Sequence, residues 1–522
     1  MTLFDILIVI LIVQVVHFLG TWKLYQRAGR SAWQAIIPVY NAYILMKIIN
    51  RPWWWIFLLF IPVVQLLMFP VIWIETAKSF GHDDPNKSIL SVITFGFYLY
   101  YINYFTTSEY EGNRELKAKT KAGETLGSIV FAVVAATIVH TYFIQPFTIP
   151  TSSLEKSLLI GDFLFVSKFH YGARTPGTAI AFPMVHDTIP GIKVKSYASE
   201  PQLPMFRLPG FEDVSRNDIV VFNWPVDTVP YFRYSGPKTY LKPIDKKSNY
   251  VKRAVGVAGD SLEIKDGKIY TNGQPLQLPE RADLQYSYII KGDNFNLNTL
   301  QNRYDITDGF GFINREQGIF KAIAIPDSKI ERFKKLPNVE SAVKDILSKT
   351  DTKPSKKVFP NQAKRDWNRD NFGPIYIPEA GQTVEIDTSS IDFYKRIIEV
   401  YEGREMGEEQ NISIKGDQVL LNGNPITSYT FKQNYYWMMG DNRHNSEDSR
   451  FWGYVPQSHV VGKPVFIWLS LDPNKSGLSK IRWDRMFTTV SGEGKRVSYL
   501  PYFLIGLVLI VGFRYFRKKR KS

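Results

Sequence analysis

The sequence contains no cysteine. That absence excludes disulfide scaffolds, thiol nucleophiles, cysteine-based zinc sites and iron–sulfur clusters. No Lys or Arg precedes the first apolar run, residues 3–20, and no small-residue cleavage site follows it. A removable signal peptide is therefore not expected at the N-terminus. Segments of low complexity are absent as well.

Apolar and basic residues, by contrast, are plentiful. Hydrophobic residues make up 45% of the 522 residues and aromatic residues 15%, which is enough to bury a large core and to exclude a wholly disordered chain. The length fits two to four domains of about 100–200 residues each. Lys and Arg number 64 against 49 for Asp and Glu, a net charge of +15. The two ends of the chain are very apolar, whereas the middle is polar.

Several apolar runs have the length of a membrane span, which needs about 20 apolar residues to cross a hydrocarbon core of about 30 Å. The runs cover residues 3–20, 52–74, 89–105, 125–144 and 498–514. Buried core helices are the alternative, but a core helix rarely lacks a polar face for so long. The third run is the least typical because it contains Asn103 and many tyrosines. We expect about four N-terminal spans and one C-terminal span.

Basic residues indicate how these spans are oriented. They are concentrated after the first and third runs, at Lys23, Arg27, Arg30, Lys47, Arg51, Arg114, Lys117, Lys119 and Lys121. The C-terminal span is followed by a basic tail, Arg517 to Lys521. If all these residues are cytoplasmic, as basic loops usually are, residues 145–497 lie outside the cytoplasm and are tethered at both ends. A nucleic-acid patch is the alternative for the tail, but its place beside a span favours contact with anionic lipid.

The middle of the chain has the pattern of a mainly β domain. Short β-branched and aromatic runs recur at residues 162–171, 218–224, 250–260 and 418–426. The dipeptides Asn272-Gly273 and Asn422-Gly423 predict tight hairpin turns. They fall in two similar segments, 261–276 and 412–426, which we interpret as two similar hairpins rather than a repeat. Residues 327–348 are expected to be helical and 350–371 to form a surface insertion.

These patterns divide the chain into six segments. The fold class we expect is a helical transmembrane anchor with a mainly β extracytoplasmic catalytic domain and an α/β insertion. The segments are an N-terminal membrane module with three spans (1–124), an anchor leading into the catalytic domain (125–145), the first part of the β domain (146–276), the insertion (277–371), the second part (372–497), and a C-terminal span with its basic tail (498–522).

Three segments of the middle region carry groups suited to chemistry. A cluster of hydroxyls lies in FTIPTSSLEKSLLIGD, residues 147–162, just after the fourth apolar run. Taken alone, that cluster fits a capped turn as well as a site. Lys252 stands in the middle of an apolar strand, beside Arg253. Residues 440–456, GDNRHNSEDSRFWGYVP, form a long loop dense in charged and hydrogen-bonding groups.

Together these segments resemble the conserved boxes of bacterial type I signal peptidases, the Ser–Lys leader peptidases. The nucleophile box corresponds to Ile149 to Leu154 with Leu158 to Asp162, and the lysine box to Tyr250 to Asp260. The last box matches GDNRxNSxDSRxWGxVP at every fixed position from Gly440 to Pro456. Leu154 replaces the usual Met, where we expect an apolar contact at a membrane-facing lip. The stretch from Glu155 to Ser157 replaces the usual Pro-Thr.

The lysine makes chemical sense as a base. A serine hydroxyl is a poor nucleophile until a base removes its proton, and Lys252 can do so only when neutral. A free lysine has a pKa of about 10.4, so a base that works near neutral pH needs a lowered pKa. Burial among Val251, Ala254 and Val255 favours the neutral form. Strand alternation directs Lys252 and Arg253 to opposite faces, so burial should outweigh repulsion from Arg253.

The resemblance implies a role for each site residue. Ser153 is the nucleophile and Lys252 the general base, and the oxyanion hole consists of the Ser153 amide and the Thr151 hydroxyl. Supporting roles are implied for Ser446, which would bond and orient Lys252, and for Asp448, which would pair with Arg253 and Arg450. The cleft should accept small side chains before the cut, and neither a cofactor nor a metal is required.

Other chemistries were weighed against this interpretation. A Ser–His–Asp triad would use His444, near Asp441 and Asp448, but His444 falls at a variable position of its box. Calcium could bind the acidic residues of 440–456, but the arginines there oppose a dication. His170, after the first strand, is expected to be structural. A catalytically dead binding scaffold would lack Ser153 or Lys252, and both are present.

The predicted function is that of a membrane-bound serine endopeptidase that cleaves N-terminal signal peptides from exported preproteins. The predicted location is the cytoplasmic membrane, with several spans and the catalytic domain outside. The expected partners are preproteins and the lipid bilayer, with no nucleic acid. A Ser–Lys peptidase with a narrow set of membrane substrates is the alternative. Residues 1–110 either anchor the chain at the interface or form an accessory module that docks on the translocation machinery or on a second membrane subunit.

Overall fold

The computed structural model describes residues 2–192, 194–229, 236, 240–304, 306–350, 358–360, 365–492 and 494–520. Residues 351–357 and 361–364 of the expected surface insertion, and Lys521 of the basic tail, lie outside the described residues. The chain divides into two compact units, which are described separately. The first holds residues 1–143, 174–207 and 228–246, and the second holds 144–173, 208–227 and 247–522.

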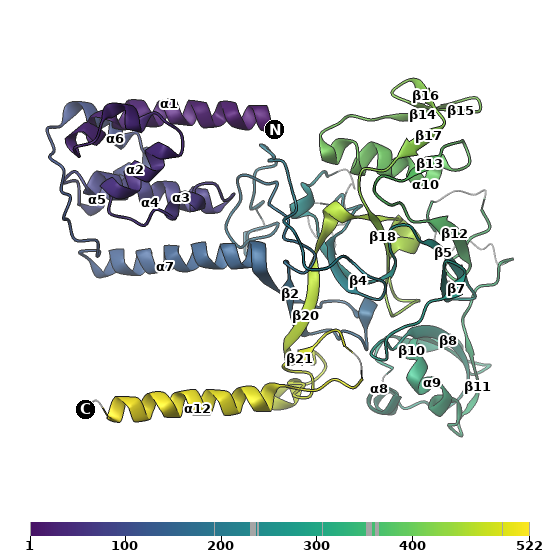
Figure 1. The fold of residues 1–522 in the computed structure, drawn as a ribbon. Helices are drawn as coiled ribbons and strands as arrows, with labels where there is room; N and C mark the ends of the chain where they lie inside the picture. The colour runs from purple at the N-terminus through teal and green to yellow at the C-terminus, as the bar shows by residue number, and fades with distance from the viewer. Residues whose placement is uncertain are drawn as a thin grey trace. The chain divides into compact units, whose positions relative to one another are not determined.

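The first unit is helical at its N-terminal end. Its helices are α1 (Leu3–Arg27), α2 (Tyr40–Ile48), α3 (Trp55–Leu58), α4 (Val64–Lys78), α5 (Pro85–Ile93), α6 (Tyr98–Phe105) and α7 (Lys121–Ile138), which continues in wider turns to Phe143 (Figure 1). Asn103, the polar residue of the third apolar run, is fully buried and joins α6 to α1. Its side chain accepts the amides of Lys23 and Leu24 and donates to the Leu19 carbonyl.

Among the described residues, three helices are long and apolar enough to cross a membrane, Leu3–Arg27, Lys121–Phe143 and Leu500–Arg517. The count rises to four if α5 and α6, which meet at 113°, form one broken span. The five expected spans are therefore not all reproduced. Residues 52–74 do not form one helix, because Pro62 disfavours a helical residue before it and Val63 adopts φ +69°. The 15-residue helix that follows, α4, is too short to span a core of about 30 Å.

The second unit is built on a large antiparallel sheet. Its strand order is β1-β2-β20-β3-β4-β18-β19, and a short strand, β21, pairs with β20. The strands are β1 (Ile144–Thr148), β2 (Asp162–Ser167), β3 (Ile219–Asn223), β4 (Asn249–Gly256), β18 (Tyr435–Met439), β19 (Val455–Pro456), β20 (Val460–Ser470) and β21 (Thr488–Thr489). The mainly β catalytic region expected from the sequence is present. The apolar C-terminal helix α12 (Leu500–Lys519) follows it.

Two small meanders account for the similar segments 261–276 and 412–426. One joins β5 (Ser261–Lys265), β6 (Lys268–Thr271), β7 (Gln274–Pro275) and β12 (Phe372–Tyr376). The other joins β14 (Ile412–Lys415), β15 (Gln418–Leu421) and β16 (Asn424–Ile426). Asn272 and Asn422 have φ of 53° and 51°, and the following glycines are also left-handed, as the predicted Asn-Gly turns require. A two-stranded pair, β13 (Thr383–Glu385) and β17 (Ser428–Thr430), lies nearby in sequence.

The insertion has its own sheet and core. Its strand order is β11-β8-β10-β9, and the strands are β8 (Gln285–Gly292), β9 (Phe310–Asn314), β10 (Ile319–Pro326) and β11 (Val339–Lys344). Figure 1 shows α8 (Leu297–Tyr304) and α9 (Asp327–Lys334) beside this sheet. The helix expected over 327–348 is wrong in its second half. Pro337 follows the end of α9, and Val339 to Lys344 pair with β8 as a strand.

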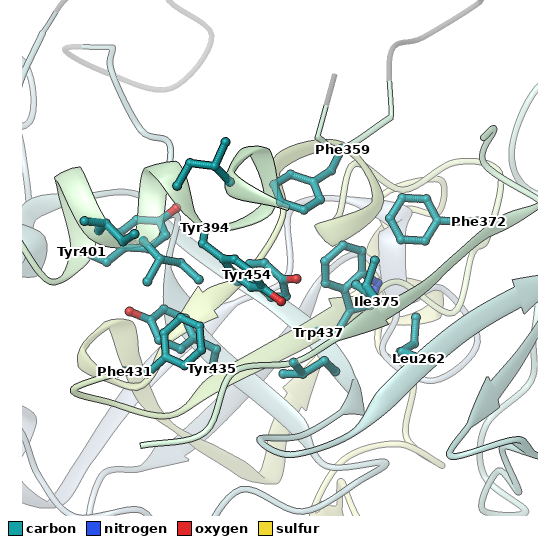
Figure 2. Close-up of a cluster of buried hydrophobic side chains, with 14 of the residues drawn as sticks. Leu262, Phe359, Phe372, Ile375, Tyr394, Tyr401, Phe431, Tyr435, Trp437 and Tyr454 are labelled. Atoms are coloured by element: carbon teal, nitrogen blue, oxygen red, sulfur yellow. The ribbon is translucent and has the colours of Figure 1, made fainter. Parts of the chain in front are cut away.

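An aromatic core lies between the main sheet and helix α10 (Ile391–Arg396), which continues in wider turns to Tyr401. Trp437 of β18 is fully buried at its centre, with its ring edge-on to Phe359 and Tyr454 (Figure 2). A second core, with Leu154, Leu158 and Leu164 at its centre, lies under the segment that carries the hydroxyl cluster. Both cores therefore lie beside strands that carry candidate site residues.

The close backbone approach at Gly161, beside the segment that carries the hydroxyl cluster, can be tested by substitution. Its φ is +87°, and a methyl group there would overlap the carbonyl oxygen of Leu471. Gly423 has φ +85° and open space around it. We expect Gly161→Ala to lower the free energy of unfolding by about 2 kcal/mol more than Gly423→Ala, because only the first adds a steric clash to the same backbone strain. Thermal unfolding of the two purified variants in detergent would measure the difference, and equal losses would contradict it.

Candidate active site

A short turn presents Ser153. The turn, Ser152–Leu154, follows Thr151 in extended conformation, and its far end is anchored because Leu154 is only 1% exposed. The backbone amide of Ile149 donates to the backbone carbonyl of Asp162, and the carbonyl of Ile149 accepts from the amide of Gly161. These two bonds join the chain before the turn to the chain after it. Leu154 packs in the core, so the expectation of a membrane-facing lip at this residue is wrong.

Lys252 faces this serine from β4, which is flanked by β3 and β18 in the sheet. Its side chain is buried, with 3% of the residue exposed. A hydrogen bond of 2.6 Å joins Nζ of Lys252 to Oγ of Ser153, although the two residues are far apart in sequence. The structure thus brings together the two residues that the sequence analysis singled out as a pair.

Burial lowers the pKa of Lys252 to about 8, while the carboxylates of Asp448, Glu447 and Asp441 act in the opposite direction. Burial is the largest influence, as expected from the apolar strand. With this pKa about a tenth of the amine is neutral at pH 7, far more than for a free lysine with a pKa of about 10.4, and the neutral form can accept a proton. Such a group in contact with a hydroxyl is the arrangement that nucleophilic catalysis requires.

Two groups were predicted to form the oxyanion hole. The backbone amide of Ser153 makes no hydrogen bond within the described part of the chain, and the Thr151 side chain is exposed and caps nothing. Both groups can thus donate to an incoming oxygen.

Two buried ion pairs surround the lysine. Asp448 caps helix α11 (Ser449–Trp452) and binds Arg450 through two bonds of 2.8 Å. Arg253 pairs with Asp441, through bonds of 2.8 and 2.6 Å, and not with Asp448 as the resemblance implied. Burial opposes ionisation of Asp441, yet Arg253 and Ser157 hold the pKa of that carboxyl below its usual value.

Ser446 differs from its implied role in one respect. Its hydroxyl is buried and bonds none of the described residues, so the contact with Lys252 is not formed. The hydroxyl lies beside Gly440, where any side chain would overlap both Ser446 Oγ and the carbonyl of Ser153. Gly440 thus allows the loop 440–456 to approach the nucleophile turn closely.

His444, the histidine of the competing triad, is engaged by other residues. Both ring nitrogens of His444 are occupied, Nδ1 by the Ser287 amide at 3.1 Å and Nε2 by Asp370 at 2.8 Å, so neither faces Ser153. No cluster of three metal-ligating side chains occurs among the described residues. His170 bonds Ser167 in the turn after β2.

The sequence analysis missed three polar residues at this site. Asp441 and Ser157 complete the environment of Arg253, and Asp308 of the insertion bonds the loop 440–456. Asp441 stands at a fixed position of the last box, which was a usable signal. The insertion lies outside the boxes, and nothing in its sequence singles out Asp308.

The fold and the buried contact between a serine and a lysine are those of a serine hydrolase, and its chain carries apolar helices long enough to cross a membrane. Residues 122–317 and 377–469 match the family described as signal peptidase, peptidase S26. The chain belongs to that family, as its resemblance to type I signal peptidases indicated. Residues 33–113 match a separate family of unknown function.

Similar proteins include three bacterial enzymes, each named signal peptidase I. The one from Buchnera aphidicola subsp. Acyrthosiphon pisum (strain APS) is 23% identical, over 79% of this chain and 92% of its own length. The one from Helicobacter pylori (strain ATCC 700392 / 26695) is 24% identical, over 71% and 94%. The one from Haemophilus influenzae (strain ATCC 51907 / DSM 11121 / KW20 / Rd) is 22% identical, over 74% and 80%.

Proposed function

We propose that this chain is a membrane-bound serine endopeptidase that removes N-terminal signal peptides from exported preproteins, with Ser153 as nucleophile and Lys252 as general base. The observation that carries the proposal is the 2.6 Å contact between the serine hydroxyl and a buried amine. Membership of the signal peptidase family and the names of its relatives support the choice of substrate.

The proposed reaction uses these groups in turn. Neutral Lys252 takes the proton of Ser153 as Oγ attacks the scissile carbonyl carbon. The oxyanion of the tetrahedral intermediate is stabilised by the Ser153 amide and the Thr151 hydroxyl. The protonated amine then gives its proton to the leaving amino group, the peptide bond breaks, and an ester remains on Ser153. Water, deprotonated by Lys252, hydrolyses the ester and restores the serine.

The remaining polar residues are assigned supporting roles. The unpartnered hydroxyl of Ser446 lies beside the nucleophile turn and can bond the amine when it becomes protonated. Asp448 and Arg450 fix the loop that carries Ser446. Arg253, paired with Asp441 behind β4, holds the same loop against the sheet.

For the membrane arrangement, we propose that residues 145–497 lie outside the cytoplasm at the cytoplasmic membrane. The basic residues that follow the first and third apolar runs, together with the basic tail, support this orientation. Ser153 follows the candidate span Lys121–Phe143 closely in the chain, which favours a site near the bilayer surface, where the cleavage site of a membrane-bound substrate emerges.

The domain limits are proposed as drawn from the sequence. They are 1–124, 125–145, 146–276, 277–371, 372–497 and 498–522. For residues 1–110 the two roles stated above, interfacial anchoring and docking on the translocation machinery or a second membrane subunit, are kept as alternatives. Reconstitution with and without a translocon would separate them, because only docking predicts copurification.

Loss of either member of the pair should abolish cleavage. We expect Ser153→Ala and Lys252→Ala each to lower kcat for a purified preprotein at least about 10³-fold, because nucleophile and base act as one unit. Lys395→Ala, at an exposed lysine of α10, is the control and should cleave like the wild type. Cleavage by both site variants would refute the assignment of the pair, and a wild type that cleaves no signal peptide would refute the function.

The pH dependence of cleavage should report the amine. Because the neutral form is the active one and burial lowers the pKa of Lys252 to about 8, kcat/KM should rise with pH through a midpoint near 8. The exposed carboxylate of Glu447 raises the pKa of this lysine, so Glu447→Gln should move the midpoint to lower pH. A midpoint that stays fixed in Glu447→Gln, or that lies near the pKa of a free lysine, would contradict this account.

The proposed orientation can be tested in spheroplasts of a bacterium that produces the chain. Externally added protease should digest residues 145–497, whereas a tag placed after Ser522 should be protected until the membrane is opened. The expectation rests on the basic residues at the C-terminal end, Arg517 to Lys521. Digestion of the tag with protection of the central region would reverse the orientation.

A further inference from the structure

The insertion is bonded directly to the backbone of the loop 440–456. Gln285, the first residue of β8, forms a parallel bridge with Asn442. Its amide donates to the Asp441 carbonyl at 3.0 Å, and its carbonyl accepts from the Arg443 amide at 2.8 Å. His444 adds a second connection, because its two ring nitrogens bond Ser287 of β8 and Asp370.

A third connection is made by Asp308 and leads to the nucleophile turn. One carboxylate oxygen, Oδ2, accepts from the side-chain amides of Asn442 at 2.6 Å and Asn445 at 2.9 Å. The same two amide nitrogens also donate to Ser152, to its carbonyl at 3.2 Å and to its hydroxyl at 3.1 Å. In addition, the backbone amide of Asn442 donates to the Ser153 carbonyl at 3.1 Å.

The backbone on either side of Asp308 is fixed within the insertion. Ile306, two residues before Asp308, is 5% exposed in the insertion core, and its amide donates to Leu300. On the other side of Asp308, the backbone carbonyl of Gly309 accepts a hydrogen bond of 2.8 Å from the amide of Ile323 in β10. Asp308 is thus fixed by the packed sheet of the insertion and not by the loop that it contacts.

We infer that Asp308 is a positioning residue, through which the insertion sets the orientation of the nucleophile turn; the inference rests on the proposed function of Ser153. A carboxylate can only accept hydrogen bonds, so it forces both side-chain amides to present their NH₂ groups. Each amide then has one hydrogen left for Ser152. The Oδ1 atom of Asn442 is buried without a partner, so the orientation of this amide is set by its donor side.

Removing the carboxylate would release this constraint. The Asn442 amide would then keep only one of its two acceptors, so its side chain would be free to rotate away and break the bond to the Ser152 carbonyl. A small displacement of a nucleophile has large kinetic effects, about 10²-fold in rate for about 1 Å. Asparagine at position 308 can still accept both bonds through its carbonyl oxygen.

The test uses the full-length chain in detergent and compares Asp308→Ala with Asp308→Asn and a matched control. The control is Asp283→Ala, which also removes a carboxylate of the insertion that accepts two bonds, from the amide and hydroxyl of Ser328. We expect Asp308→Ala to lower kcat about 10- to 100-fold with little change in KM. Asp308→Asn should stay within about threefold of the wild type, and Asp283→Ala should keep the wild-type kcat.

A double-variant cycle separates positioning from a general loss of stability. If Asp308 acts through the two amides, its loss should cost much less in a background that lacks both of them, Asn442→Ala combined with Asn445→Ala. The pH midpoint of kcat/KM should stay at its wild-type value in Asp308→Ala, since the lysine is not the group displaced. A kcat for Asp308→Ala equal to that of Asp283→Ala, or fully additive effects in the cycle, would overturn the inference. Because wild-type cleavage and the inactivity of Ser153→Ala are measured in the same assay, such a result would leave the proposed function standing.

Discussion

An amine can act as a base near neutral pH only where its charged form is poorly stabilised. Around Lys252 this condition is demanding, because Asp441 and Asp448 are buried close by and each raises the pKa of the amine. Each of these carboxylates is bound by an arginine, Asp441 by Arg253 and Asp448 by Arg450. The two ion pairs keep the field at Lys252 small, so that burial stays the dominant influence on its pKa.

The strand order of the main sheet meets this requirement for a poorly stabilised charge at Lys252. Lys252 is buried because its strand, β4, is central and has β3 and β18 on either side. Placing β18 next to β4 also brings the loop 440–456, which follows β18, to the lysine. Arg253 alternates to the other face of β4 and binds that loop from behind. Burial of the base and neutralisation of its surroundings are thus consequences of one strand order.

Much of the site could be predicted from the sequence, because the boxes fix residue types at short spacing. Ser153 and Lys252 were found in this way, and the structure places them in contact. The partner of Arg253 was misassigned because the last box contains two aspartates, Asp441 and Asp448, and spacing alone does not distinguish them. Asp308 could not be predicted, because its contact with the loop 440–456, far away in the sequence, depends on tertiary packing.

The fold was predicted less evenly, for reasons that are local. The apolar composition of residues 52–74 predicts one span, although Pro62 interrupts that run. Similarly, a single helix was predicted over 327–348, although Pro337 separates a helix from a strand. The Asn-Gly turns succeeded because the left-handed backbone at Asn272 and Asn422 is a property of the dipeptide itself. The turns were predicted because a single dipeptide determines each of them. The ends of the helices were not, because each depends on whether one proline outweighs a long apolar or helix-forming stretch.

The insertion acquires a physical role from the way the loop 440–456 is held. That loop bonds Ser152 and Ser153 on one side and the strand β8 and Asp308 on the other. Residues 440–448 of this loop belong to none of the hydrophobic cores found among the described residues, so their geometry depends on the two packed regions that they join. A hydrogen-bonded loop between two packed bodies has less freedom than one that faces solvent on one side. The insertion, with a sheet and core of its own, supplies the second body.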